Sequence, residues 1–309
     1  HYSYLKIAEG CGKNCTYCII PKLKGKFRSV PMEDLVDEAG QLAEAGVKEL
    51  ILVAQETTIY GTDLYGKKML PELLKRLNDI DGIEWIRILY CYPEEITKEL
   101  VEAIKKLPKV CHYIDMPIQH ASDHILRRMA RATTHDEIKE RIAYIREEIP
   151  DITLRTTLIS GFPGETEKDH EILKQFVEEM AFDRLGDFEY SKEEGTKAAE
   201  FSHQVSARNK KLRRDEIMEL QHEVSLNKAK TRVGNVYRVM IEGRLVDDAG
   251  DFRSGDSDGN VYVGRTYMDA PDVDGLIYIN TGSRQFMTGD MVEAKVTAVS
   301  EYDLIGELV

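Results

Sequence analysis

Three cysteines stand close together near the start of the chain, at positions 11, 15 and 18. Thiolates are soft ligands that favour iron–sulfur clusters, zinc or cuprous copper. A zinc site normally has four protein ligands, commonly as two pairs, and the sequence contains no second cysteine pair. Clusters that only transfer electrons usually have cysteine at all four corners. Cys11, Cys15 and Cys18 therefore predict a [4Fe–4S] cluster with one open iron, which is what a reactive site needs.

The two remaining cysteines, Cys91 and Cys111, stand alone in or beside apolar runs of strand type. We expect both to be small core side chains. Five cysteines, three of them clustered, do not resemble the disulfide framework of a secreted protein. This usage indicates a metal site in a reducing compartment, and we expect a cytoplasmic protein.

The elements that must position this loop alternate between strand and helix over the first ~230 residues. Such alternation is typical of a parallel α/β sheet, with ligands bound at the carboxyl ends of the strands. Six βα units predict an open, partial (β/α)6 barrel related to the eight-stranded TIM barrel. The expected strands are 4–9, 49–55, 85–90, 112–116, 153–159 and 184–190, and the expected helices are 31–45, 70–77, 97–107, 125–130, 136–149 and 167–180.

A long charged helix is expected over 205–232, and the pattern of residue types changes after Gly234. Helical periodicity stops there, and Gly and Asp alternate with β-forming residues. We expect a small antiparallel barrel of five strands, similar to an OB fold. The predicted domains are therefore 1–231 and 232–309.

The motifs at the strand ends resemble those of a known family. A CxxxCxxC loop with Tyr17 before its third cysteine resembles the radical SAM superfamily. The runs 55–64, 89–93, 113–122, 155–166 and 188–196 make the chain similar to the methylthiotransferase family, whose members carry a TRAM domain, here from about residue 233. The resemblance implies that the open iron is chelated by S-adenosylmethionine (SAM). Reductive cleavage of SAM then gives methionine and a 5′-deoxyadenosyl radical, which abstracts hydrogen.

Within this family, Tyr92-Pro93 and the run 190–196 look like the branch that modifies ribosomal protein S-twelve. The resemblance implies a methylthio group added to an aspartate β-carbon, with that basic protein and an electron donor as partners. The alternative is a tRNA adenosine methylthiotransferase. Family members also have an N-terminal domain whose cysteines hold a second [4Fe–4S] cluster. We expect this chain to be a fragment that lacks that domain.

Several residues are candidates for contacts with SAM. The resemblance places Tyr17 near the adenine and Gln55-Glu56 near the amino group, although ordinary packing and a paired loop are the alternatives. Gln119 would contact SAM or the substrate. His120, beside it, could act as a general acid or base or only as a structural hydrogen-bonding group.

Two further candidates follow in the fifth strand and its loop. Arg155 could clamp the SAM carboxylate through two parallel hydrogen bonds or form an ordinary ion pair. Gly161 would allow the close approach of a ligand, with adenine implied by the resemblance, or simply form a turn.

Charge separates the two branches. The chain has a net charge of −13 and a pI of about 5.2. From Thr231 to Val309 it has one Lys and six Arg against 14 Asp and Glu, a net of −7. Phosphate contacts dominate affinity for nucleic acids, so this segment favours a basic protein over tRNA as partner. No apolar run of 18 residues predicts a membrane span and no secretion signal is visible.

Overall fold

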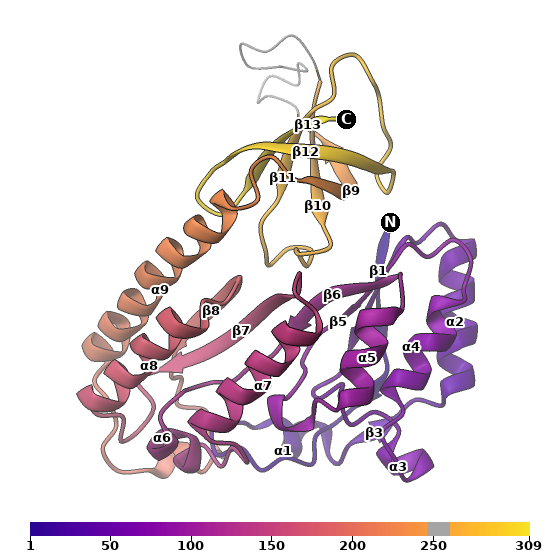
Figure 1. Ribbon diagram of the computed structural model, residues 1–309. Helices are drawn as coiled ribbons and strands as arrows, with labels where there is room; N and C mark the ends of the chain where they lie inside the picture. The colour runs from indigo at the N-terminus through magenta and orange to yellow at the C-terminus, as the bar shows by residue number, and fades with distance from the viewer. Residues whose placement is uncertain (246–259) are drawn as a thin grey trace. The chain divides into compact units, whose positions relative to one another are not determined.

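A computed structural model of the chain describes residues 1–245 and 260–309. The chain divides into two compact units (Figure 1): Ser3–Gln221, and His222–Val309 together with His1–Tyr2. The sequence-based boundary between residues 231 and 232 stays a prediction. In the described part of the chain, no helix is both long enough and apolar enough to cross a membrane.

The larger unit contains a six-stranded sheet in which the strands follow their order in the chain, β1-β4-β5-β6-β7-β8. All pairs from β4 to β8 are parallel, so the predicted open α/β sheet is confirmed. The strands are β1 (Tyr2–Lys6), β4 (Glu49–Val53), β5 (Trp85–Ile88), β6 (Val110–Asp115), β7 (Thr153–Ser160) and β8 (Arg184–Glu189).

The first predicted strand, 4–9, is divided in the structure. β1 ends at Lys6, and β2 (Ala8–Glu9) pairs with β3 (Arg28–Ser29) in a separate antiparallel ribbon. Ile7 lies between them. Its N–H donates a hydrogen bond to the Val53 carbonyl, and its own carbonyl accepts one from the Val30 N–H. The change of partner turns the chain away from the sheet just before the cysteine loop.

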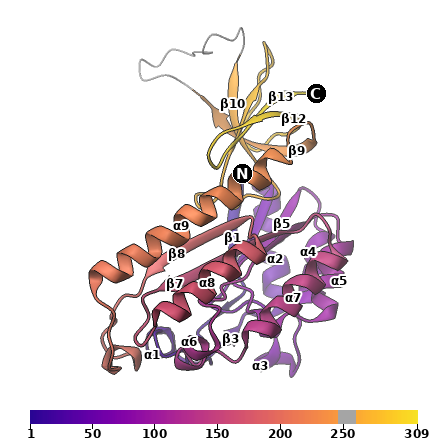
Figure 2. The same cartoon turned by 60° about the vertical axis from the view of Figure 1, so that its left-hand side comes forward.

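The long helices bury their apolar stripes against the sheet and lie along its outer face (Figure 2). Gly46 follows the first of these helices with a φ of +95°, as its role as a terminating glycine requires. Two others begin with capping boxes, at Thr134 and at Thr166. These helices are α2 (Met32–Glu44), α4 (Leu70–Asn78), α5 (Lys98–Lys106), α7 (His135–Glu148) and α8 (Glu167–Met180).

Short elements gather at one end of the larger unit, where Figures 1 and 2 both show α1, α3, α6 and β3. They belong to the connections that leave the carboxyl ends of the strands. The helices among them are α1 (Ile20–Lys24), α3 (Thr62–Tyr65) and α6 (Asp123–Arg128). The connections after β5 and β8 also contain the 3₁₀ turns η1 (Pro93–Glu95) and η2 (Ala198–Glu200).

The smaller unit is a closed five-stranded barrel with the order β10-β11-β13-β12-β9. One pair, β11 with β13, is parallel, whereas the sequence predicted an antiparallel barrel. The reason is that β12 follows β11 in the chain but lies on the far side of β13. The strands are β9 (Val236–Arg244), β10 (Val261–Thr266), β11 (Ile277–Asn280), β12 (Met291–Val299) and β13 (Leu304–Leu308). The predicted long helix is α9 (Ala207–Lys230).

Candidate active site

The cysteine loop joins β2 to α1 and is anchored at several points. The Cys11 N–H donates to the Gly25 carbonyl at 3.1 Å, and the Thr16 N–H donates to the Met129 carbonyl at 3.0 Å. Gln55, directly beyond β4, accepts a 2.6 Å hydrogen bond from the Gly10 N–H through its side-chain oxygen. Thus three separate parts of the larger unit fix the backbone of this loop.

The three thiols of this loop suit a cluster better than a single metal ion. Cys11 and Cys15 are buried and Cys18 is half-buried. Burial raises the pKa of Cys11 and of Cys18, and the neighbouring Cys15 thiol adds to the rise in both. Among the described residues, no three His, Cys, Asp or Glu side chains converge on one ion. Thiols that bind different irons of one cluster need not share an ion, so this donor set fits a [4Fe–4S] cluster.

A cavity of about 440 Å³ opens beside these thiols at the carboxyl ends of the strands. Two thiols face it, together with residues from the connections after β4, β5 and β6. Its lining consists of Lys6, Cys11, Tyr17, Cys18, Ile20, Val53, Ala54, Gln55, Tyr90, Tyr92, Pro117, Gln119 and Thr157. Strand ends of a parallel sheet are where such folds bind their ligands.

The cavity thus brings together two of the predicted cysteine ligands and three predicted SAM contacts, Tyr17, Gln55 and Gln119. Tyr17 packs edge-on against Phe162, with ring centres 6.4 Å apart. Burial and the nearby Cys15 raise the pKa of the Tyr17 phenol, which is therefore neutral. Gln119 is held by hydrogen bonds to both sides of Leu158 in β7, through Thr157 and Ile159.

Cys15, Glu56, Arg155 and Gly161 are not among the residues that line the cavity. Glu56 is fully buried and accepts a 3.0 Å hydrogen bond from the Thr58 N–H. Burial raises the pKa of Glu56 to about 7. Its predicted contact with the SAM amino group is untested.

The structure also gives Arg155 and Gly161 other partners. Arg155 pairs with Asp115 of the neighbouring strand at 2.9 Å. Gly161 has a φ of +77°, and a Cβ there would lie 2.4 Å from Cγ of Lys210 in α9. The missing side chain at Gly161 therefore makes room for α9. Contacts of these two residues with SAM stay predictions.

His120 is fully buried, and its Nδ1 accepts a 2.9 Å hydrogen bond from the Ser122 N–H. Burial lowers the pKa of His120 to about 3, so the imidazole is neutral. These observations favour the structural alternative for His120 over acid–base chemistry.

Sequence reasoning missed Tyr90 and Arg131. Tyr90 lines the cavity with a left-handed backbone, φ +60°, and its N–H donates to Asp115 at 3.1 Å. Gln119 shares this backbone region at φ +72°. Strained non-glycine residues of this kind concentrate at functional sites, but nothing in the local sequence signals them. Arg131 carries a buried guanidinium beside Tyr92.

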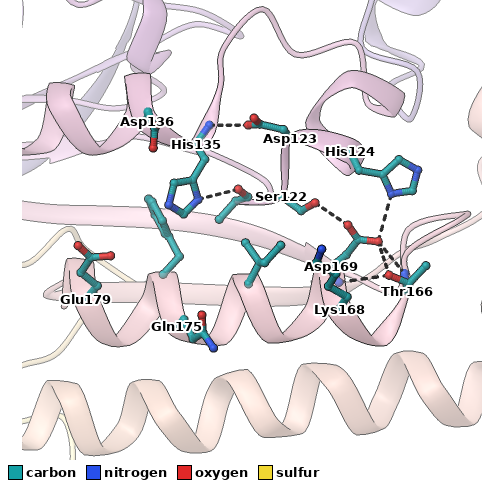
Figure 3. Close-up of a pocket in the computed structure, with 13 residues that line it drawn as sticks. Ser122, Asp123, His124, His135, Asp136, Thr166, Lys168, Asp169, Gln175 and Glu179 are labelled. Atoms are coloured by element: carbon teal, nitrogen blue, oxygen red, sulfur yellow. Dashed lines mark hydrogen bonds and ion pairs between the residues drawn. The ribbon is translucent and has the colours of Figure 1, made fainter.

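A second cavity, of about 700 Å³, lies among α6, α7 and α8 (Figure 3). It shares no residue with the cysteine cavity. Its central carboxylate, Asp169, accepts hydrogen bonds from Ser122 and Thr166 and lies 3.1 Å from His124. The His135 N–H donates to Asp123. These groups satisfy one another and cap helices, so this cavity is not the candidate active site.

The radical SAM superfamily matches residues 5–177, and the TRAM domain matches residues 233–309. Relatives include "Ribosomal protein uS12 methylthiotransferase RimO" of Lachnoclostridium phytofermentans, 58% identical over 99% of this chain and 67% of the relative. The protein of the same name from Clostridium kluyveri is 48% identical over 99% of this chain and 66% of the relative. The chain therefore spans about two thirds of the length of these relatives.

Solved structures share the fold at low identity. Coproporphyrinogen III oxidase (HemN) from Escherichia coli has a TM-score of 0.55 and 17% identity, and the match covers 86% of this chain and 67% of that one. Methylornithine synthase (PylB) has a TM-score of 0.51 and 12% identity over 71% and 62% of the two chains. The predicted family is confirmed: the chain belongs to the radical SAM superfamily and, within it, to the family of ribosomal protein uS12 methylthiotransferases.

Proposed function

We propose that this chain is the radical SAM and TRAM portion of an enzyme that adds a methylthio group to the β-carbon of an aspartate in ribosomal protein uS12. The observation that carries the proposal is 58% identity to a named uS12 methylthiotransferase along 99% of the chain. The cavity beside Cys11 and Cys18 supports it, because membership of the superfamily implies a [4Fe–4S] cluster and SAM at such a place.

Each side chain of the site would contribute a distinct part. Cys11, Cys15 and Cys18 would hold the cluster, which together with SAM would supply a carbon radical for hydrogen abstraction. Tyr17 and Tyr92 line the cavity with aromatic rings and would help to keep water from the reacting atoms. Gln119, fixed against β7 by backbone hydrogen bonds, presents an amide to the cavity for a polar group of SAM or the substrate.

The remaining third of the relatives' length has no counterpart in this chain. We expect that portion of the whole enzyme to hold a second [4Fe–4S] cluster and to be required for sulfur insertion. An external electron donor must reduce the cluster on the cysteine loop. The acidic C-terminal segment is expected to favour basic uS12 over tRNA.

The proposal divides into two measurements. First, the anaerobically reconstituted chain with dithionite should convert SAM into methionine and 5′-deoxyadenosine, measured by liquid chromatography and mass spectrometry. Second, the chain extended to its relatives' full length should add a methylthio mass to one aspartate of uS12, and tRNA incubated in parallel should stay unmodified. Methylthiolated adenosine in that tRNA, with uS12 unchanged, would reverse the choice between the two branches.

A further inference from the structure

The buried guanidinium of Arg131 has hydrogen-bonding capacity that the described protein does not use. Its side chain has no exposed surface. Nη2 lies 3.3 Å from the Pro117 carbonyl and 3.5 Å from a Glu94 carboxylate oxygen. Nε and Nη1 are buried and have no hydrogen-bond partner of good geometry among the described residues, and the Tyr17 phenol lies close enough to the guanidinium to interact with it. A buried charged donor without a well-aligned partner is costly, so the guanidinium keeps donor capacity for a further acceptor.

The turn that carries Arg131 is the one that anchors the cysteine loop. After α6, Ala130 adopts a left-handed backbone with φ +57°, and the Arg131 N–H returns to the Leu126 carbonyl at 2.9 Å. The Met129 carbonyl in this turn accepts from the Thr16 N–H, and the Arg128 carbonyl accepts from the Thr16 hydroxyl at 2.8 Å. Thr16 follows Cys15 directly. The backbone therefore couples the position of Arg131 to that of Cys15.

The surroundings of Arg131 show which side of the cluster it would meet. Its guanidinium carbon lies 4.1 Å from the centre of the Tyr92 ring. Burial by itself would lower the pKa of Arg131, but Tyr17, Glu94, Tyr92 and Cys15 raise it, so the group stays charged. Neither Arg131 nor Cys15 lines the cavity, whereas Tyr17 and Tyr92 do. Arg131 therefore lies behind the wall that faces the ligand.

We propose that Arg131 is a positioning residue for the cluster, its buried guanidinium donating to the cluster's sulfur atoms on the Cys15 side and offsetting their negative charge. The inference rests on the proposed placement of the cluster at the three cysteines. Reduction adds one negative charge to the cluster, and a buried cation nearby stabilises the form with more negative charge. Hydrogen bonds to the sulfurs and local charge are known determinants of cluster potentials. Arg131 therefore makes the cluster easier to reduce.

The test is the midpoint potential of the cluster, titrated anaerobically without SAM and followed by electron paramagnetic resonance. Arg131→Gln removes the charge, Arg131→Lys keeps it, and Arg127→Gln removes the same charge from an exposed position of α6. We expect a more negative potential for Arg131→Gln, a smaller shift for Arg131→Lys, and the parent potential for Arg127→Gln. Iron content and thermal unfolding are measured on the same samples.

The outcomes separate the two proposals. If the parent chain holds no four-iron cluster, the proposed function and this inference fall together. If the parent holds it and Arg131→Gln titrates at the parent potential, only the role of Arg131 is wrong. Should Arg131→Gln lose its iron, retention in Arg131→Lys supports the charge, whereas equal loss in both variants points to packing alone and overturns the inference.

Discussion

Two glycines in the cysteine loop differ in what their backbones require. Gly10 has a φ of +85°, and a Cβ on it would lie 2.2 Å from the Lys26 carbonyl oxygen. Nothing lies within 4 Å of a Cβ on Gly12. A side chain at Gly10 would thus strain the backbone and displace the bend between α1 and β3 that carries Lys26, whereas one at Gly12 meets open space.

We predict that Gly10→Ala destabilises the chain by about 2 kcal/mol or more, from the left-handed backbone and the contact with Lys26. Because Gly10 also donates to Gln55, the displaced loop should bind less iron on reconstitution. Gly12→Ala is the matched control, and it should unfold at the same temperature and bind as much iron as the parent. Thermal unfolding and iron content decide the matter, and equal behaviour of the two variants would show that the loop adapts.

The five cysteines divide into two groups by their surroundings. We predict that Ala at Cys11, Cys15 or Cys18 abolishes SAM cleavage and lowers bound iron. Cys91→Ser and Cys111→Ser should retain both, because Cys91 is buried against Thr57 and Cys111 lies in β6, and neither lines the cavity. Iron content and 5′-deoxyadenosine formation are the measurements. Full cleavage by Cys15→Ala would show that the cluster is held elsewhere.

At the scale of elements, α9 lies against β8 at a place where a carboxyl group is buried. Asp187 of β8 accepts a 2.6 Å hydrogen bond from the Ser160 hydroxyl, and Met218 of α9 accepts from its backbone N–H. Burial raises the pKa of Asp187 to about 7. The folded state therefore holds a proton that the unfolded state releases near pH 4. As pH rises from about 4 through 7, the free energy of unfolding must fall.

We predict that Asp187→Asn weakens this pH dependence. Asn still offers an oxygen to Ser160 but carries no charge to bury, so the variant should exceed the parent in unfolding free energy by the order of 2 kcal/mol at pH 8. The gain should vanish near pH 4. Urea unfolding across this pH range measures it. Glu189→Gln, at an exposed position of β8, is the control. A gain that is equal at pH 4 and pH 8 would rule out the ionisation of Asp187 as its cause.

The features of the site that are formed by residues close together in the sequence were predictable. The spacing of the cysteines and the polar runs after the strands indicated the end of the sheet at which the structure has the cysteine cavity, because carboxyl ends of parallel strands share one edge. The partners of Arg155 and Gly161 were not predictable, since Asp115 and Lys210 approach them only in the folded chain. Arg131 gives no local signal either, because its N–H donors are buried away from water only in the folded chain.

The fold was predictable for the same reason, with exceptions that depend on pairing. Hydrophobic periodicity located the strands of the larger unit, but it could not show that the segment 4–9 changes partners at Ile7. In the barrel, the parallel pairing of β11 with β13 depends on where β12 lies, and spacing along the chain does not determine that. Alternation predicts strands, whereas neighbours are set by tertiary packing.

At the scale of the whole molecule, the charge of residues 231–309 is the feature that concerns partners. Two groups of aspartates contribute to it: first Asp247, Asp248, Asp251, Asp256 and Asp258, and second Asp269, Asp272 and Asp274. In the second group, Asp269 is buried and bonded to Thr266, and Asp274 accepts from the Ala270 N–H. These two carboxylates hold the turn after β10 and are poorly placed to steer a partner. The first group lies outside the described residues. We infer that any steering of a basic partner by this segment depends on that group.

We predict that replacing these five aspartates by Asn slows association with uS12 and weakens its dependence on salt. Long-range attraction between opposite charges speeds encounter, and it is screened within about 8 Å at physiological ionic strength. SAM cleavage without uS12 should be unchanged, because the cysteine cavity lies in the other unit. Association rates measured from low to high salt, with tRNA as a second ligand, test the prediction.

The matched control neutralises five exposed acids of α2 instead, namely Glu33, Asp34, Asp37, Glu38 and Glu44. It changes the net charge of the chain by the same amount at a place far along the sequence from the TRAM segment. If both variants slow association equally, overall charge and not the aspartate group governs encounter. If the five-Asn variant associates as fast and as salt-sensitively as the parent, the group has no steering role. Tight binding of tRNA by the parent would show that −7 charges over residues 231–309 do not exclude nucleic acid, since local basic contacts would then outweigh the net repulsion.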